Sequence, residues 1–256
     1  MSLSTYAGGK IEMERRNFFK SIALVTLSGH LAGGFVKNAI AAAKEKIKHT
    51  FGMGIQINKC IGCGRCVEAC KDENNVPKEP FYFRTWVERY IIRNNGEVNV
   101  QNIDSRISGT IPAVHEGEML RSFFVPKLCN QCENPPCVQV CPVGATFKTE
   151  EGVIIIDDTR CIGCRYCIQA CPYGARYLHP VKKTADKCTF CYHRITKGML
   201  PACVEVCPTQ ARIFGDIHSN ASPLARFKRM NKLHVLKPSL NTEPKVSYSD
   251  LDGEVR

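Results

Sequence analysis

The sequence predicts an α+β protein built from two small cysteine-rich modules, with an inserted β-rich segment and an extended C-terminal arm. Three observations carry this prediction. The chain has 256 residues and 16 cysteines, and all of the cysteines fall in four tight groups. Three of the groups end in Cys-Pro, and short apolar stretches flank the groups as strands would. The hydrophobic fraction of 44% includes these cysteines, so the remaining apolar core is thin.

The four cysteine groups have nearly regular spacing. They read Cys60-x2-Cys63-x2-Cys66-x3-Cys70, Cys129-x2-Cys132-x4-Cys137-x3-Cys141, Cys161-x2-Cys164-x2-Cys167-x3-Cys171 and Cys188-x2-Cys191-x11-Cys203-x3-Cys207. The pattern C-x2-C-x2-C-x3-C-P is that of bacterial ferredoxins, in which three cysteines bind one cluster and the fourth binds its neighbour. Two groups therefore complete two clusters reciprocally. Four groups predict four [4Fe-4S] clusters and use every cysteine.

Zinc and disulfides are the alternatives to iron–sulfur clusters. Paired C-x2-C knuckles can bind zinc through four thiolates, but zinc needs neither the third cysteine two residues later nor the recurrent Cys-Pro. Disulfide scaffolds are normally much shorter than this chain and do not clump their cysteines. Iron–sulfur clusters are therefore favoured.

An internal repeat supports a bacterial-ferredoxin-like fold. The repeated segments are Cys141-Pro-Val-Gly-Ala145, Cys171-Pro-Tyr-Gly-Ala175 and Cys207-Pro-Thr-Gln-Ala211. Apolar strands are expected at 53–57 and 152–156, and the three residues between Cys167 and Cys171 suit one helical turn. Clusters would replace much of the apolar core of these small βαβ units.

The order of the groups predicts nested modules. Residues 129–180 form an inner two-cluster module, because the second and third groups are nearly contiguous. Residues 44–128 would supply the first half of an outer module plus the insertion, residues 181–215 its second half, and residues 216–256 the C-terminal arm.

The insertion at 71–128 resembles a β-hairpin. Residues 81–92 and 98–103 are strand-like and flank Asn95-Gly96, a frequent hairpin turn. We expect Trp86 and Tyr90 to pack over the clusters. In the arm, we expect a helix at 223–230 and then an extended segment at 233–248 that lies along a partner protein.

The N-terminus resembles a twin-arginine-type export signal. Arg15-Arg16 precede Phe18, Phe19 and Lys20, a mildly apolar stretch follows, and Ala41-Ala42-Ala43 offers a cleavage site. We therefore predict that residues 1–43 are a signal, either cleaved or retained as an anchor, and that the protein is periplasmic. Met13 is a possible start. An amphipathic helix is the alternative.

The formal net charge of +11 does not indicate nucleic-acid binding. Each oxidised four-iron site with four thiolates carries about −2, so four sites offset most of the basic excess. No basic stripe with interleaved aromatic residues is present. Lysines and arginines near the cysteines either raise the cluster potentials or are solvated surface residues, and we favour the second interpretation. They are Lys182, Lys183, Lys187, Arg165 and Arg194.

No catalytic residues are expected in this chain. A cluster with four protein thiolates has no open position for substrate. Three histidines lie near the cysteines, but the thiolate count is complete without His179, His193 and His218. Tyr166, Tyr173 and Tyr192 are expected to pack.

The stretches 179–191 and 200–209 carry a specific resemblance. His179-Pro-Val-Lys-Lys-Thr-Ala-Asp-Lys-Cys188-Thr-Phe-Cys191 and Leu200-Pro-Ala-Cys203-Val-Glu-Val-Cys207-Pro-Thr209 resemble the four-cluster iron–sulfur subunits of the molybdopterin (dimethyl sulfoxide reductase) oxidoreductase superfamily. They look most like the subunits of formate-dependent nitrite reductase and of the membrane redox complexes of sulfate reducers. The resemblance spans about residues 53–250.

This resemblance implies four ligand sets. They are Cys60, Cys63, Cys66 and Cys207; Cys70, Cys188, Cys191 and Cys203; Cys129, Cys132, Cys137 and Cys171; and Cys141, Cys161, Cys164 and Cys167. Two residues depart from patterns in the family. Lys71 follows Cys70 where the other groups have proline. Cys164 stands where nitrate reductases have a tryptophan and a three-iron cluster, so a four-iron cluster is favoured.

The resemblance also implies partners. The outer module would face a molybdopterin-type catalytic subunit or a multihaem cytochrome, and the inner module an integral-membrane quinone-interacting subunit. The expected function is electron transfer within an exported respiratory oxidoreductase, attached to the membrane through partner subunits. The alternative is a free-standing periplasmic polyferredoxin.

Overall fold

The computed structural model describes residues 49–79, 81–103 and 118–255. The predicted export signal lies outside these residues. In chain order the elements are β1 (Phe51–Gln56), η1 (Ile57–Lys59), α2 (Arg65–Glu73), β2 (Thr85–Arg93), β3 (Val98–Ile103), β4 (Met119–Leu128), α3 (Pro136–Gln139), β5 (Thr146–Lys148), β6 (Ile154–Ile156), α4 (Tyr166–Gln169), β7 (Arg176–Leu178), β8 (Ala185–Lys187), α5 (Tyr192–Ile195), α6 (Ala202–Glu205), β9 (Arg212–Asp216), α7 (Pro223–Met230), β10 (Leu233–His234), η3 (Pro238–Leu240) and β11 (Val246–Ser249).

A four-stranded sheet brings the first and fourth cysteine groups together. Its strand order is β10-β11-β1-β9, and β9 runs antiparallel to β1 from Phe51 opposite Asp216 to Ile55 opposite Arg212. Just beyond this register, the amide of Gln56 donates to the carbonyl of Ala211 at 2.8 Å. Cys60 follows β1 and Cys207 precedes β9, so the strand pairing places these cysteines at the same end of the sheet.

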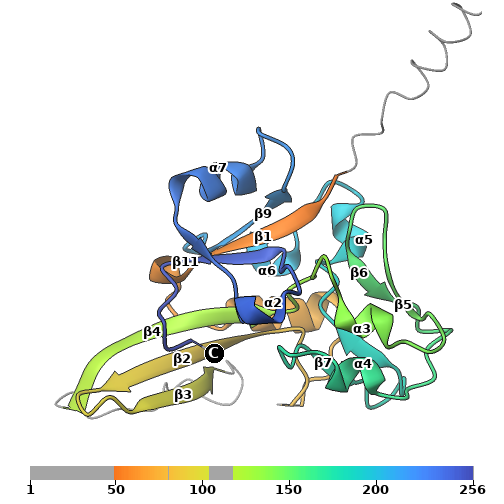
Figure 1. Cartoon of the computed structure of the whole chain (residues 1–256), viewed down its shortest axis with the longest axis horizontal. Coiled ribbons are helices and arrows are strands. Elements are labelled where there is room, and N and C mark those ends of the chain that lie inside the picture. Colours follow the sequence, from red (N-terminus) through yellow and green to blue (C-terminus); the bar gives the residue numbers. More distant parts are fainter. Residues whose placement is uncertain (1–48, 80, 104–117, 256) are drawn as a thin grey trace, which may run out of the picture. The chain divides into compact units, whose positions relative to one another are not determined.

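The insertion forms a separate three-stranded antiparallel sheet in the order β3-β2-β4, seen as the long ribbon at the lower left of Figure 1. The β2–β3 hairpin closes near Gly96, whose φ of 84° requires the left-handed conformation that glycine favours. The predicted hairpin is present, although β2 begins at Thr85 and β4 adds a third strand that the sequence did not predict. Tyr90 is buried and stacks on Phe123, with 5.4 Å between the ring centroids.

The predicted inner module and the strand β8 that pairs with its last strand, together residues 129–187, consist of very short elements. Two hairpins, β5–β6 and β7–β8, have three residues in each strand, and the helices α3 and α4 have four residues each. The β5–β6 pairing runs from Thr146 opposite Ile156 to Lys148 opposite Ile154. Helices of this length are not stable alone in water. The module therefore needs stabilisation beyond its own secondary structure.

The C-terminal segment belongs to this chain's own sheet. β11 lies between β1 and β10 and runs parallel to β1, with Met53 opposite Val246. Val246 and Tyr248 are fully buried. The expectation of an extended arm along a partner is therefore wrong for this segment, because its apolar residues are buried within the sheet of the outer module.

The helix expected at 223–230 is present as α7. Its N-cap Ser222 accepts a hydrogen bond from the amide of Leu224 at 3.2 Å, and Pro223 occupies the first helical position. Phe227 packs on β1 at Gly54, where a Cβ atom would lie 2.4 Å from its ring. This close approach explains the glycine in β1.

Within the part of the chain that the structure describes, no helix has the length and apolarity needed to cross a bilayer.

Candidate iron–sulfur sites

The outer module contains two cavities, each lined by four cysteines. One is lined by Cys60, Cys63, Cys66 and Cys207, together with Pro208 and Arg212. The other is lined by Cys70, Cys188, Cys191 and Cys203, together with Asn74 and Arg84. These are two of the four sets implied by the family resemblance. Each combines thiols from distant parts of the chain because α2 packs against α6 and β1 pairs with β9.

The inner module brings a third set together. Cys129, Cys137 and Cys171 lie close enough to Cys132 for their negative charges to oppose its ionisation. The packing of α3 against α4 brings together the elements that carry the cysteines of the fourth set. Cys141 lies just after α3, and Cys164 and Cys167 flank the start of α4. The thiol of Cys161 is held in place by a hydrogen bond from β8, in which the amide of Ala185 donates to Cys161 Sγ at 3.4 Å.

The same turn opens every cysteine group. The second residue after the first cysteine has a positive φ in all four groups: Gly62 (71°), Gln131 (46°), Gly163 (70°) and Phe190 (54°). This left-handed residue turns the chain so that the next cysteine points to the same side as the first. Glycine adopts it freely in two groups, whereas Gln131 and Phe190 are held there by complete burial. The sequence did not predict these two positions.

Several of the thiols are in environments that disfavour free thiolates, whereas for Cys141 and Cys207 hydrogen bonds outweigh burial and lower the pKa. Burial raises the pKa of Cys60 and Cys203 to about 11, and it raises the pKa of Cys70 and Cys188 strongly, with further increases from neighbouring cysteines. Metal coordination deprotonates such thiols outright and removes this penalty. The four buried thiols that converge in the second site therefore fit a bound metal cluster better than they fit an empty core.

N–H donors directed at the sulfur atoms also fit iron–sulfur clusters. The amide of Phe190 donates to Cys188 Sγ at 3.4 Å, and Asn74 Nδ2 lies 3.6 Å from the Sγ atoms of both Cys70 and Cys191. Hydrogen bonds to cluster sulfur tune reduction potential. Arg212 Nη1 and Arg176 Nη2 are buried N–H groups without a hydrogen-bond partner among the residues that the structure describes. Cluster sulfur would satisfy them.

The cations near the cysteines differ in exposure and in their partners. Lys182, Lys183 and Arg165 are exposed, as favoured from sequence. Arg194 is held by Glu73, at 2.6 Å, and by Glu205. Lys187 contradicts the surface interpretation, because it is fully buried and donates to the carbonyl of Cys188 at 2.7 Å.

Sequence reasoning missed two buried arginines, Arg176 and Arg212. A signal for them exists: each is the residue after the repeated Cys-Pro-x-x-Ala segment.

The rings of His193 and His179 have partners other than cysteine, and His218 is bonded through its backbone. His193 Nε2 lies 2.6 Å from Glu73, and His179 Nδ1 accepts from the amides of Val181 and Lys182, both at 3.2 Å. The amide of His218 donates to Asp216 at 2.9 Å.

The three tyrosines differ. Tyr173 forms a hydrogen bond with Thr242 at 2.5 Å and Tyr192 donates to Glu151 at 3.0 Å, so both are packed and hydrogen-bonded. The expectation that Tyr166 packs is wrong, because 59% of it is exposed.

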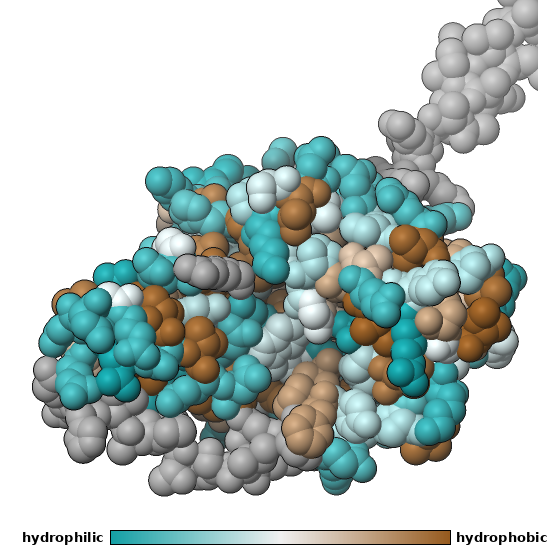
Figure 2. All heavy atoms as spheres, turned by 60° about the horizontal axis from the view of Figure 1, so that its bottom comes forward, coloured by the Kyte–Doolittle hydropathy of each residue, from teal (hydrophilic) through white to brown (hydrophobic). Residues whose placement is uncertain are grey.

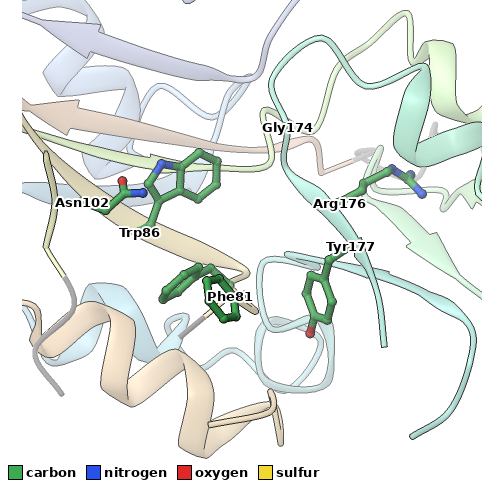
Figure 3. A pocket seen from close by; sticks show the side chains of 7 residues that line it. Phe81, Trp86, Asn102, Gly174, Arg176 and Tyr177 are labelled. Carbon is green, nitrogen blue, oxygen red and sulfur yellow. The ribbon is translucent and has the colours of Figure 1, made fainter. Parts of the chain in front are cut away.

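A surface pocket lies between the inserted sheet and β7 (Figure 3). Its lining includes Phe81, Trp86, Asn102, Arg176 and Tyr177. Trp86 donates from Nε1 to Glu88 at 2.8 Å and packs against the core. The lining residues include no nucleophile with an adjacent base, so the pocket offers no evident catalytic machinery.

These observations define a ferredoxin-like protein with two four-cysteine cavities and a third set of neighbouring cysteines. Comparison with known families agrees. Two family models, both described as "4Fe-4S dicluster domain", match residues 59–145 and residues 120–217. Two dicluster domains with 16 cysteines correspond to four [4Fe-4S] clusters.

Named relatives identify the family. A subunit of the tetrathionate reductase of Salmonella typhimurium is 38% identical over 96% of this chain and 92% of its own length. The corresponding tetrathionate reductase subunit of Archaeoglobus fulgidus is 49% identical over 78% of this chain and 81% of its own length. Protein NrfC of Escherichia coli is 34% identical over 91% and 93%, respectively. The chain belongs to the family of four-cluster iron–sulfur subunits of the dimethyl sulfoxide reductase superfamily, which confirms the resemblance stated above.

Proposed function

We propose that this protein is the iron–sulfur electron-transfer subunit of an exported respiratory reductase complex. It relays single electrons between a membrane subunit that reacts with quinone and a catalytic subunit. The observation that carries the proposal is the arrangement of cysteines from the first and fourth groups, distant in the chain, around two shared cavities. Relatives named as subunits of tetrathionate and selenate reductases support the assignment to a complex.

We assign the ligands as four sets. The first site consists of Cys60, Cys63, Cys66 and Cys207, and the second consists of Cys70, Cys188, Cys191 and Cys203. The third site consists of Cys129, Cys132, Cys137 and Cys171, and the fourth consists of Cys141, Cys161, Cys164 and Cys167. When bound, a [4Fe-4S] cluster stores and releases one electron. The protein's own part is to supply the thiolates, exclude water from most of them and hold neighbouring sites close together.

The first and fourth sites differ from the second site in the exposure of their cysteines. Cys63 in the first site and Cys164 in the fourth are exposed, whereas all four cysteines of the second site are buried. Exposed apolar residues lie beside both exposed thiols: Ile61 at the first site, and Ile162 and Tyr166 at the fourth. Figure 2 shows apolar residues exposed over the inner module. The first and fourth sites are our candidate contacts with the catalytic and membrane subunits, respectively.

The catalytic partner is either a molybdopterin-type subunit or a multihaem cytochrome. A free-standing periplasmic polyferredoxin is the alternative function. The C-terminal segment does not separate these possibilities, since β11 is buried within this chain.

Blue-native electrophoresis of membranes from the native host tests the proposal, with this chain detected by antibody. We expect the chain in a band much heavier than its own 28.6 kDa, together with a catalytic and a membrane subunit. Migration only at the monomer mass would support the free carrier. Iron analysis of the purified protein should give about 16 iron atoms per chain, and zinc in their place would contradict the proposal.

Export is tested separately. Replacing Arg15 and Arg16 by lysine should leave the protein in the cytoplasm with its iron intact, because the proposed route carries folded proteins. Unchanged fractionation of this variant would contradict a twin-arginine signal.

A further inference from the structure

Each two-cluster module contains one buried arginine at an equivalent place in the repeat. Arg176 ends the segment Cys171-Pro-Tyr-Gly-Ala-Arg176, and Arg212 ends Cys207-Pro-Thr-Gln-Ala-Arg212. The two arginines begin the strands β7 and β9. Only 6% of Arg176 and 3% of Arg212 are exposed. Buried arginines are rare unless something compensates their charge.

Arg212 lies between the two sites of the outer module. Its Nη2 donates to Cys66 Sγ at 3.4 Å and to Thr85 Oγ1 at 2.8 Å. Its guanidinium interacts electrostatically with Cys66 and Cys60 of the first site and with Cys203 of the second. One fixed positive charge therefore faces both sites.

Arg176 has the corresponding place in the inner module. Its Nη1 donates to Thr146 Oγ1 at 3.4 Å. Its guanidinium interacts with Cys129, Cys137 and Cys171 of the third site and with Cys167 of the fourth. Figure 3 shows this side chain turned away from Trp86 and Phe81 of the surface pocket. A buried threonine positions each arginine in the same way.

Neither arginine has a carboxylate partner among the described residues. Arg84 provides the contrast, since it also lies near the second site but pairs with Asp186 at 2.8 Å. An unpaired buried charge is strongly unfavourable. The charge that compensates Arg176 and Arg212 is therefore that of the thiolates and the clusters they bind.

We propose that Arg176 and Arg212 set the reduction potentials of the clusters in their own modules, each raising both potentials of its pair. The proposal rests on the ligand sets assigned above. Reduction adds one negative charge to a cluster, and a nearby cation in a medium of low dielectric constant stabilises that charge. Lys187 is also buried among the cysteine loops, but we confine the proposal to the arginines because guanidinium keeps its charge at all relevant pH values.

The test is an EPR-monitored redox titration of the anaerobically purified full-length holoprotein. Arg212→Gln removes the charge and keeps hydrogen-bonding capacity. We expect it to lower two of the four cluster potentials, by at least about tenfold in the reduction equilibrium constant, which is about 59 mV for a one-electron couple. Arg176→Gln should lower the other two. Arg212→Lys and Arg176→Lys should stay closer to the wild-type potentials than the glutamine variants.

Arg65 and Arg165 are matched controls. Each is an exposed arginine between the second and third cysteines of its group. Because solvent and salt screen exposed charges, Arg65→Gln and Arg165→Gln should change the equilibrium constants by less than about threefold.

Three outcomes would overturn the proposal: unchanged potentials in the glutamine variants, equal shifts in the lysine variants, or a glutamine variant that loses iron while its lysine counterpart keeps it. The last outcome would assign the arginine to cluster assembly. Absence of four iron–sulfur signals in the wild type would instead contradict the proposed function itself.

Discussion

Gln131 and Cys188 connect the two modules through a buried hydrogen bond. Gln131 Nε2 donates to the carbonyl of Cys188 at 2.7 Å, and Gln131 Oε1 accepts from the amide of Ile154 at 2.7 Å. Gln131 is fully buried between two cysteines of the third site, and Cys188 belongs to the second. One side chain thus ties the ligand loops of two neighbouring sites to β6.

Replacing Gln131 by alanine should destabilise the protein. The amide of Ile154 would be left buried without its partner, and an unsatisfied buried group costs about 1–3 kcal/mol. We expect a lower midpoint of thermal unfolding and faster iron loss in an anaerobic melt followed by cluster absorbance. Gln169→Ala, at an exposed position in α4, is the control and should behave as wild type. Equal behaviour of the two variants would show that the Gln131 bonds contribute little.

Gly163→Ala should be more damaging than Gly174→Ala. Both glycines have positive φ values, 70° and 61°, so both variants incur a backbone cost of about 1–2 kcal/mol. Only at Gly163 would the new Cβ meet backbone, 2.4 Å from the carbonyl oxygen of Lys183; at Gly174 nothing lies within 4 Å. We expect a further loss of about 1–3 kcal/mol at Gly163 from this overlap.

Chemical unfolding of both glycine variants, monitored by iron release, measures the difference. Gly174→Ala serves as the control for the backbone cost. If the two variants unfold at the same denaturant concentration, the close approach between the third cysteine group and the β7–β8 turn is not maintained in solution.

Tyr248 should stabilise the folded protein through its buried ring and not through its hydroxyl group. The side chain is fully buried in β11, and its hydroxyl has no hydrogen-bond partner among the described residues. Tyr248→Ala should cost about 3–5 kcal/mol, as for other large aromatic residues in cores. Tyr248→Phe should leave stability nearly unchanged. The midpoints of thermal unfolding of the two holoprotein variants measure this difference. An alanine variant as stable as wild type would indicate that this segment is a free arm.

Removing iron should unfold the inner module before the inserted sheet. Residues 129–187 contain only three-residue strands and four-residue helices, which cannot persist without the clusters that join them. β2 and β4 are nine and ten residues long and pair along nearly their full lengths. Limited proteolysis after anaerobic chelation should therefore cut first within residues 129–187. Earlier cleavage within β2 or β4 would contradict this order.

Several features could be predicted because they depend on residues close together in the chain. The cysteine spacing predicted iron–sulfur chemistry, Asn95-Gly96 predicted the β2–β3 hairpin, and the 223–230 helix begins at its serine cap. The strand at 152–156 is present as the shorter β6. Each of these is a local turn, cap or periodic pattern.

Other features could not be predicted, because they depend on which distant residues share a buried space. The sequence around Val246 and Tyr248 is extended in either a free arm or a central strand, and only pairing with β1 distinguishes the two. The positive φ values of Gln131 and Phe190 are likewise maintained by tertiary burial against their own intrinsic preferences.

For this protein, the number, type and spacing of the cysteines were sufficient to define four cluster sites, because metal ligation requires particular atoms at short chain separations. The repeat marks the positions of Arg176 and Arg212 in the sequence, but only the tertiary structure decided that their side chains are buried. Arg176 and Arg212 look like ordinary strand residues until β7 and β9 are folded against the cysteine loops. Burial then removes the water that would otherwise screen their charges, so each acts on two sites at once.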